Sequence, residues 1–470
     1  LWVVYMGNNE VHGPFGPGTV FGARSPAMWQ IRAGSAIKRM RLGQWLAERL
    51  QPSGDEVIKT WGGLEMFLEQ QVSAGDPSLE RVCQHFETNL ESIIELAGTE
   101  RIPVVVSNVV VNLRDFPPFS SSTGGEGGAQ HEFERGRELL ASGDLAGAAE
   151  KLSRARDLDT LRLRTDSRLN AITAELARDR TDDHVYFVDA VSGLAAAAPS
   201  GIPGDEFVYE HVHLTFSGNY LLARLIAEQA VQALGLAGSG NDSWIAEDEC
   251  ARRLGLTLWH RARNLERTAE RLARPPFNQQ VGHQERMAEL ERRLGVMRRS
   301  LTSEVEEESL NSSRALLAQN PDDWVLREQF ADLLEAAGDF EAASDEIAAV
   351  VERLPHRPSM WYRLGALRNR QRDWEAAEGA LRQALKLQPR YPQALNSLGI
   401  CLSRQGDFDE SYECFERAVE VMPWYGQAYF NWGLVLENQR EVDAAAERYQ
   451  DAIDASPDHI AAHQQLGQIH

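Results

Sequence analysis

The sequence predicts an α/β domain followed by an all-helical repeat array. Near-continuous Val and Ile runs, separated by amphipathic stretches, indicate buried parallel strands alternating with helices across residues 1–236. A pattern that recurs every 34 residues across 324–470 indicates a solenoid of helical pairs. Between the two we expect a helical linker region at 237–320, which opens on a Gly- and Ser-rich segment at 237–242 and carries charges of alternating sign, typical of a solvated hairpin.

Three short apolar runs are the strands expected in the first domain: Trp2–Met6, Ile102–Val111 and His184–Val188. Because their apolar residues are consecutive rather than alternating, we expect helices on both faces of a parallel sheet. Amphipathic stretches at Ser25–Leu50 and Ser78–Gly98 predict two of those helices, the second ending on a glycine.

A helical pair is predicted to interrupt this domain at about residues 129–162. Within it, Gly136, the Gly143-Asp144-Leu145 turn and Ala148 have the same relative spacing as the corresponding residues of the C-terminal repeats. We interpret the pair as a repeat-like hairpin inserted between two strands, because insertions in loops cost little stability. An αα-hairpin that matches by chance is the alternative.

The C-terminal repeats have a regular internal pattern. A leucine or tryptophan followed by glycine lies in the first helix of most units, and small residues recur where two helices must cross closely. This pattern resembles the tetratricopeptide repeat, which implies a groove for a protein or peptide partner. Because a solenoid needs a polar cap, we expect the natural protein to continue past His470. The units are predicted to start at Trp324, Pro358, Pro392, Gly426 and Ile460.

Composition narrows the classes of function. A formal net charge of -22 argues against nucleic acid as the main partner. The four cysteines lack metal-ligand spacing, so we expect no metal site, no disulfide framework and no cofactor. No apolar run is long enough to span a bilayer. The chain opens within a strand, so the compartment stays open, with an export signal or membrane anchor upstream of Leu1 among the alternatives.

Two distant segments carry residues suited to acyl transfer. Gly7-Asn8-Asn9-Glu10 ends the first strand, where the amide of Asn9 can donate a hydrogen bond to a developing oxyanion. Far downstream, Glu210 precedes His213 by three residues, so its carboxylate can orient the imidazole as a general base. Asp205 is the alternative acid. His211 is expected to point the other way and to be structural, and His12 to be an exposed loop histidine.

The two segments together resemble the blocks of the SGNH (GDSL-like) hydrolase superfamily, with a glutamate at position 210 where an aspartate is usual. The resemblance implies a flavodoxin-like three-layer α/β/α fold and the hydrolysis or transfer of esters. It makes Asn9, with Gly7, the oxyanion donor, His213 the general base and Glu210 its orienting partner. The nucleophilic serine is then expected upstream of Leu1, so the chain by itself is expected to be inert.

The stretch at 107–120 resembles bacterial members in which such a domain is fused to tetratricopeptide repeats, and there it flanks the active site, which adds Asn108 to the predicted cleft. We therefore weigh two functions. The first is a serine esterase or O-acyltransferase whose repeats recruit a partner or a polymeric substrate. The second is a catalytically degenerate domain in a scaffold for protein–protein interaction, in which Asn9 is a turn residue and His213 a polar residue at a helix start.

Overall fold

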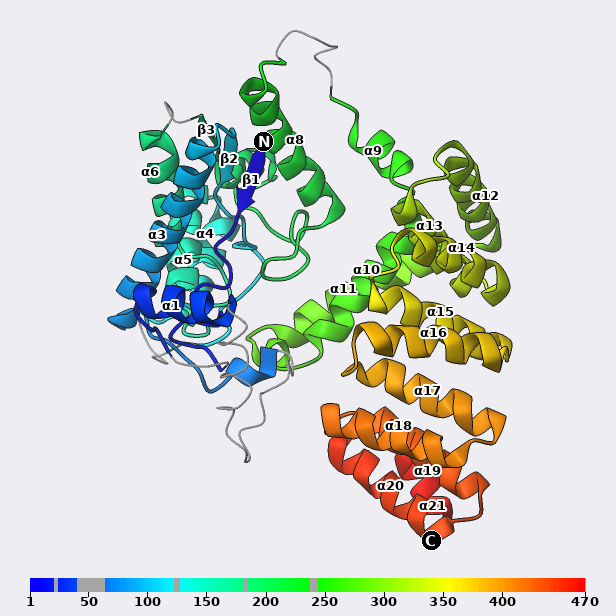
Figure 1. Cartoon of the computed structure of the whole chain (residues 1–470). Coiled ribbons are helices and arrows are strands. Elements are labelled where there is room, and N and C mark those ends of the chain that lie inside the picture. Colours follow the sequence, from blue (N-terminus) through cyan, green and yellow to red (C-terminus); the bar gives the residue numbers. More distant parts are fainter. Residues whose placement is uncertain (21–23, 40–63, 122–126, 181–183, 237–243, 470) are drawn as a thin grey trace. The chain divides into compact units, whose positions relative to one another are not determined.

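The computed structural model describes residues 1–20, 24–39, 64–121, 127–180, 184–236 and 244–469 (Figure 1). The chain forms two compact units. The first comprises Leu1–Ala251 and His260–Arg299, and the second comprises Arg252–Trp259 and Ser300–His470. The predicted linker at 237–242 lies outside the described residues.

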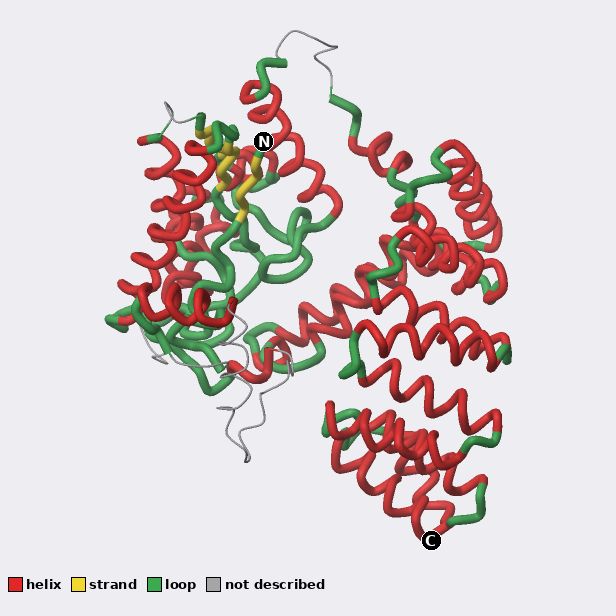
Figure 2. Tube along the Cα trace, viewed as in Figure 1, coloured by secondary structure: helices red, strands yellow, loops and turns green. Residues whose placement is uncertain are grey.

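The first unit contains a three-stranded parallel sheet, drawn in yellow in Figure 2. Its strands are β1 (Trp2–Tyr5), β2 (Val104–Ser107) and β3 (Val185–Val188), in the order β1-β2-β3. In this register Val105 pairs with both Val3 and Tyr186. All four residues of the central strand are buried, as expected for a parallel strand that is covered on both faces.

One face of the sheet packs against α3 (Ser78–Thr99) and α6 (Ser167–Asp179). Val104 and Val106 of the central strand share a core with Phe86 of α3 and with the apolar face of α6. The helix α3 forms because its apolar residues recur every three or four positions, so that they lie on one side. It continues one residue beyond the glycine at which we expected it to end.

The opposite face packs against α7 (Ala190–Ala197) and α8 (Phe216–Ala233). Val105, whose side chain points away from those of its two strand neighbours, shares a second core with Leu194 and Leu221. The described part of the sheet is therefore sandwiched between helices. Three strands do not identify a flavodoxin-like or SGNH fold, so that assignment stays a prediction.

The strand predicted at Ile102–Val111 ends four residues early, at Ser107. Side-chain amides take over the hydrogen bonds of the backbone that follows. Asn170 accepts a hydrogen bond from the Val109 amide at 2.8 Å and donates one to the Val109 carbonyl at 3.0 Å. These bonds satisfy the backbone without another strand, so the apolar residues after Ser107 form a buried loop.

The helical pair predicted at about 129–162 is present between β2 and β3 as α4 (Ala129–Ser142) and α5 (Leu145–Leu158). A left-handed Gly143 ends α4, and the Asp144 carboxylate caps α5 by accepting a hydrogen bond from the Gly147 amide. The first unit also contains α1 (Met28–Arg39), η1 (Leu64–Phe67), η3 (Phe277–Gln279) and α11 (His283–Ser300). The predicted helix at 25–50 begins at Met28, and its residues from 40 onward lie outside the described ones.

The helices after the linker are less solvated than their alternating charges suggest. They are α9 (Glu247–Arg253) and α10 (Leu258–Leu272), followed by η3 and α11. Leu265 of α10 and Leu290 of α11 are buried in one core with Phe116. The prediction of a solvated hairpin was therefore wrong for one face of these helices, because widely spaced leucines give that face enough apolar surface to be buried.

The second unit is a stack of helical pairs, and every predicted start of a repeat coincides with the first residue of a helix. Each pair places its first helix against the second through small residues, and a proline follows most second helices. The helices are α12 (Ser303–Gln319), α13 (Trp324–Ala336), α14 (Phe340–Arg353), α15 (Pro358–Gln371), α16 (Trp374–Leu387), α17 (Pro392–Gln405), α18 (Phe408–Val421), α19 (Gly426–Asn438), α20 (Val442–Ala455) and α21 (Ile460–Ile469).

One glycine in each central repeat sets the distance between its two helices. A Cβ atom built on Gly365 would lie 2.5 Å from Leu381 Cγ, which stands sixteen positions later in the chain. The same spacing joins Gly399 to Phe415 and Gly433 to Tyr449. Only a glycine allows the partner side chain to lie directly on the helix backbone at these places.

Candidate functional site

The predicted acid and base lie in a short hairpin-like segment that ends at α8. Val208 and Leu214 form an antiparallel bridge, and the Tyr209 amide donates to the His213 carbonyl at 2.8 Å. The Thr215 hydroxyl then caps α8 by accepting a hydrogen bond from the Gly218 amide at 3.1 Å. This backbone arrangement folds residues 210–213 back on themselves, so that side chains three positions apart meet.

Glu210 is the centre of this arrangement. One carboxylate oxygen, Oε1, contacts His213 Nδ1. The other, Oε2, lies 2.6 Å from His211 Nδ1 and accepts a hydrogen bond from the Val212 amide at 3.0 Å. The Glu210 side chain is fully buried, whereas that of His213 is 60% exposed. A buried carboxylate therefore contacts one nitrogen of an imidazole that is largely exposed.

Arg271 of α10 is a third partner of the same carboxylate. Its Nη1 donates to Glu210 Oε1 at 2.7 Å and lies 3.1 Å from His213 Nδ1. Sequence reasoning missed this residue, because Arg271 is one of many charges in a helix of alternating sign and nothing in its spacing relates it to position 210. The guanidinium places a permanent positive charge beside the Glu210–His213 pair.

The ionisation of Glu210 follows from these neighbours. Burial alone would raise the pKa of Glu210, but the charges and hydrogen bonds of His211 and His213 outweigh it and hold that pKa well below its usual range. Burial also lowers the pKa of His211. The arrangement is that of an ionised carboxylate that orients two imidazoles.

His211 is enclosed by aromatic rings. The centroids of Phe116, Phe119 and Phe277 lie 5.7, 5.3 and 5.5 Å from that of its ring. The side chain is 6% exposed, in contrast to that of His213 two positions later. His211 therefore anchors the Glu210 carboxylate from inside the core, while His213 faces outward.

The first predicted segment, residues 7–10, contacts Thr165 in the structure. Gly7 has a φ of +142°, and a Cβ there would lie 3.3 Å from the Thr165 side chain. The asparagine that is held in place is Asn8, whose Oδ1 accepts hydrogen bonds from the Thr165 amide at 3.2 Å and from its hydroxyl at 2.7 Å. Asn9 is exposed. Its predicted role as an oxyanion donor stays a prediction.

Asn9 lines a cavity of about 310 Å³ together with Glu10 and with His85 of α3. Burial raises the pKa of Glu10. Among the described residues, neither Glu210 nor His213 lines this cavity. The structure therefore brings the predicted acid and base together but shows no contact between them and the predicted oxyanion donor.

Asn108, predicted to line the cleft, is engaged in structural bonds. Its Nδ2 donates to Asp189 Oδ1 at 2.8 Å, and its Oδ1 accepts from the Val191 amide at 3.0 Å, so that it tethers the start of α7. Asp205, the alternative acid, accepts hydrogen bonds from Asn112 at 2.8 Å and from Arg286 at 2.9 Å instead of contacting a histidine. Both residues hold loops in place.

His12 was expected to be exposed and is buried instead. Its Nδ1 lies 3.2 Å from the Gly18 carbonyl, and its ring packs edge-on to Phe67. Burial lowers the pKa of His12 to about 4, although the hydrogen bond to Gly18 acts in the opposite direction. His12 is a neutral core residue that shapes the loop after β1.

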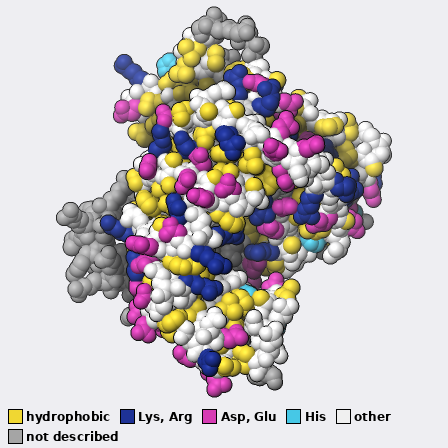
Figure 3. All heavy atoms as spheres, turned by 90° about the vertical axis from the view of Figure 1, so that its right-hand side faces the viewer, with side chains coloured by type: hydrophobic (Ala, Val, Ile, Leu, Met, Phe, Trp, Pro, Cys, Tyr) yellow, Lys and Arg dark blue, Asp and Glu magenta, His cyan; other side chains and the backbone are white. Residues whose placement is uncertain are grey.

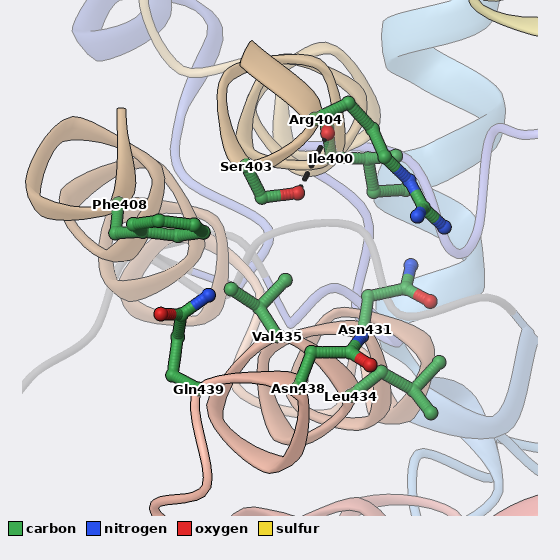
Figure 4. A pocket seen from close by; sticks show the side chains of 9 residues that line it. All are labelled: Ile400, Ser403, Arg404, Phe408, Asn431, Leu434, Val435, Asn438 and Gln439. Atoms are coloured by element: carbon green, nitrogen blue, oxygen red, sulfur yellow. Dashed lines mark hydrogen bonds between the residues drawn. The ribbon is translucent and has the colours of Figure 1, made fainter. Parts of the chain in front are cut away.

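The second unit offers a groove between the first helices of two successive repeats. A cavity of about 200 Å³ lies between α17 and α19 (Figure 4). Both apolar and polar side chains line it. The lining residues are Ile400, Ser403, Arg404, Phe408, Asn431, Leu434, Val435, Asn438 and Gln439.

The charges on the surface are mixed. On the face shown in Figure 3, Lys and Arg side chains alternate with Asp and Glu rather than forming one basic area.

Within the described ranges, no helix combines the length and the apolar run that a bilayer span requires. In the same ranges, no cluster of three or more His, Cys, Asp and Glu side chains is placed to hold a metal ion.

Comparison with known proteins identifies the repeats. Two sequence profiles of the tetratricopeptide repeat match residues 356–423 and 398–460. The C-terminal part of the chain therefore consists of tetratricopeptide repeats. No curated protein matches the sequence. The matching profiles do not include an SGNH or GDSL-like hydrolase, so the ester chemistry stays a prediction.

Among the solved structures that match part of this chain, two are described as tetratricopeptide repeat proteins. MamA is 18% identical, with a TM-score of 0.30, over 38% of this chain and 95% of its own. A thermophilic tetratricopeptide repeat protein from Thermus thermophilus is 18% identical over 38% of this chain and 95% of its own, with a TM-score of 0.31. YrrB, whose structure is described as having an unusual peptide-binding site, is 21% identical over 34% and 82%, with a TM-score of 0.30.

Proposed function

We propose that this chain is an interaction protein that binds a peptide segment of a partner in the groove between α17 and α19. The observation that carries the proposal is the cavity of about 200 Å³ between these helices. Leu434 and Ile400 offer apolar contact there, while Asn438 and Gln439 bring exposed amides that can bond a peptide backbone. Tetratricopeptide repeats in this part of the chain support the same function.

The test is a selection from a random peptide library with the whole chain as bait, followed by fluorescence anisotropy with the selected peptides. Asn438→Trp places a large side chain in the groove from an exposed position, so it should abolish binding without disturbing the core. Glu416→Trp, at an exposed position of α18 outside the groove lining, is the matched control and should bind normally. Equal binding by both variants would place the site elsewhere.

A second function is supported by the Glu210–His213 pair. We propose that these residues, in the natural full-length protein, belong to an SGNH-type esterase or O-acyltransferase that acts through an acyl-serine on an ester-bearing substrate. An exposed imidazole oriented by a buried carboxylate is what a general base requires. In this proposal Glu210 orients His213, and Asn9, with Gly7, provides the oxyanion donor after a movement of its exposed loop. The repeats would recruit the substrate carrier.

Turnover of p-nitrophenyl acetate by the full-length protein tests this second function. His213→Ala should abolish turnover, and Glu210→Gln should reduce it, since the imidazole loses its orienting carboxylate. His131→Ala, at an exposed position of α4, is the control. If the full-length protein has no esterase activity, or if His213→Ala leaves it unchanged, only the interaction function stands.

A further inference from the structure

The cavity beside Glu10 in the first unit is a further candidate site. Its volume of about 310 Å³ lies at the small end of the range of about 300–1,000 Å³ that ligand pockets occupy. Residues of the loop after β1, of α1 and of α3 line it. The lining includes Glu10, Phe15, Ser25, Met28, Val82 and His85.

Close backbone packing shapes the loop that carries Glu10 and Phe15. The Gly18 amide donates to the Val11 carbonyl at 3.0 Å. A Cβ atom on Gly16 would lie 2.0 Å from the Val11 carbonyl oxygen, so only glycine permits this approach. The loop therefore presents its side chains to the cavity from a compact backbone.

Ser25 lines the cavity with a hydroxyl that lacks a partner. The residue is 8% exposed, and its Oγ makes no hydrogen bond to the described residues. Its φ of +46° lies in the left-handed region, which is uncommon for a residue other than glycine. Arg81 of α3 supports this conformation, since its Nη1 donates to the Ser25 carbonyl at 2.7 Å. A strained, buried and unsatisfied hydroxyl at the wall of a cavity indicates a group that a ligand completes.

Glu10 brings a carboxylate that nothing in the described contacts neutralises. Burial raises the pKa of Glu10, and neither a cation nor a hydrogen bond acts in the opposite direction. Burial likewise raises the pKa of Asp159, Asp205 and Asp451, but each of these has an arginine beside it that lowers it. Among the described carboxyl groups with a raised pKa, Glu10 therefore differs in lacking a positive partner.

The rest of the described lining supplies no positive charge, because it contains neither lysine nor arginine. Burial and the neighbouring Arg81 lower the pKa of His85, so its imidazole is neutral at pH 7. The Arg81 guanidinium is bonded to the Ser25 carbonyl and does not line the cavity. The exposed ring of Phe15, in contrast, offers a π face, which attracts cations.

We propose that this cavity binds the ammonium group of a small organic amine. The ammonium donates hydrogen bonds to the Glu10 carboxylate and to the Ser25 hydroxyl, and its charge faces the ring of Phe15. The carbon chain of the amine packs against Met28 and Val82. The amine site is independent of the two proposed functions.

Three probes of similar length and different charge test the site: n-butylammonium, 1-butanol and butyrate. Their dissociation constants for the whole chain are measured by ligand-observed NMR in about 0.15 M salt, which screens the general attraction of a chain with a net charge of -22 for cations. The variants are Glu10→Gln, which keeps the shape of the side chain, and Ser25→Gly, which adopts the same positive φ without strain. Glu87→Gln, at an exposed position of α3 outside the cavity lining, is the control.

The expected result is a preference for the cation that depends on Glu10. The wild type should bind n-butylammonium about 10-fold more tightly than 1-butanol, because a hydrogen bond to a charged group is the stronger one, and it should not bind butyrate. Glu10→Gln should remove most of this preference, whereas Glu87→Gln should retain it. Ser25→Gly should weaken both n-butylammonium and 1-butanol by about 3- to 10-fold, since each donates to the hydroxyl.

Three results would overturn the amine site. Equal affinities of n-butylammonium and 1-butanol for the wild type would show that the carboxylate does not recognise the charge. A preference that survives in Glu10→Gln, or that Glu87→Gln loses to the same extent, would assign it to the net charge of the chain. Binding of none of the probes would show that the cavity is not an amine site. Failure of peptide binding or of ester turnover leaves each of these outcomes unchanged.

Discussion

Arg271 Nη1 lies 2.7 Å from Glu210 Oε1, the same oxygen that contacts His213. A helix that follows the linker therefore completes a cluster whose other members precede it by about sixty residues. The Glu210 carboxylate is fully buried, and the Arg271 side chain is 44% exposed. The carboxylate thus depends on its partners for stabilisation far more than the guanidinium does.

Replacement of Glu210 by Gln should destabilise the first unit. The amide removes the charge that His211 and Arg271 stabilise, and loss of one member of a buried ionic group costs about 3 kcal/mol. The midpoint of the urea transition should fall accordingly. Glu228→Gln on α8, where the side chain is 42% exposed, is the control and should leave the midpoint unchanged. A midpoint equally unaffected in both variants would mean that the cluster contributes no net stability.

The same carboxylate should make the first unit sensitive to acid. Because the pKa of Glu210 is lowered in the folded state, its contribution to stability is present above the ordinary glutamate pKa of 4.5 and is lost as the pH falls below it. The difference in urea midpoint between wild type and Glu210→Gln should therefore shrink between pH 7 and pH 3. Parallel curves for the two proteins would contradict the lowered pKa.

His12 should add a second pH dependence, in a higher range. Its pKa is about 4 in the folded state and 6.5 as the ordinary value, so the unfolded chain binds the proton first. Stability is fully present above pH 6.5 and declines as the pH falls toward 4. His12→Gln should remove this decline from the urea midpoints between those two values, whereas His131→Gln should retain it. Persistence of the decline in His12→Gln would assign it to another group.

Two glycines of one repeat should respond in opposite ways to alanine. Gly365→Ala places a Cβ 2.5 Å from Leu381 Cγ, and such overpacking costs about 1–3 kcal/mol. This exceeds the gain of about 1 kcal/mol that alanine brings to a helix. At Gly379 nothing lies within 4 Å of an added Cβ, so the alanine should stabilise the fold. Thermal unfolding of the two variants gives the comparison, and shifts of the same sign would refute the packing argument.

The repeats were predictable because their information is local. The glycine, the small residues and the closing proline of each unit lie within 34 residues, so their spacing alone places the first helix of each predicted unit. Glu210 and His213 could be paired for the same reason, since three positions separate them. The contact of Arg271 with Glu210 could not be predicted from the sequence, because it depends on how a distant helix packs.

The expectations that failed concern polar side chains, which can either bond nearby backbone groups or act in binding and catalysis. The strand predicted at Ile102–Val111 ends at Ser107, because the Asn170 amide bonds the backbone of the residues that had seemed to continue it. His12 was expected in solvent, yet a nearby carbonyl and Phe67 accommodate its neutral ring. Polar residues of this kind satisfy backbone groups, and sequence spacing does not distinguish that use from binding or catalysis.

The pair α4–α5 carries the repeat geometry into the first unit. A Cβ on Gly136 would lie 2.7 Å from Leu152 Cγ, the same sixteen-residue relationship that recurs in the repeats. A single unit of this type normally requires neighbours to cover its apolar surface. Here Ile202 and Leu113, which belong to loops of the α/β domain, cover it instead. Loop residues of the first unit thus cover the apolar surface of α4–α5, as the next copy does for a unit of the C-terminal repeats.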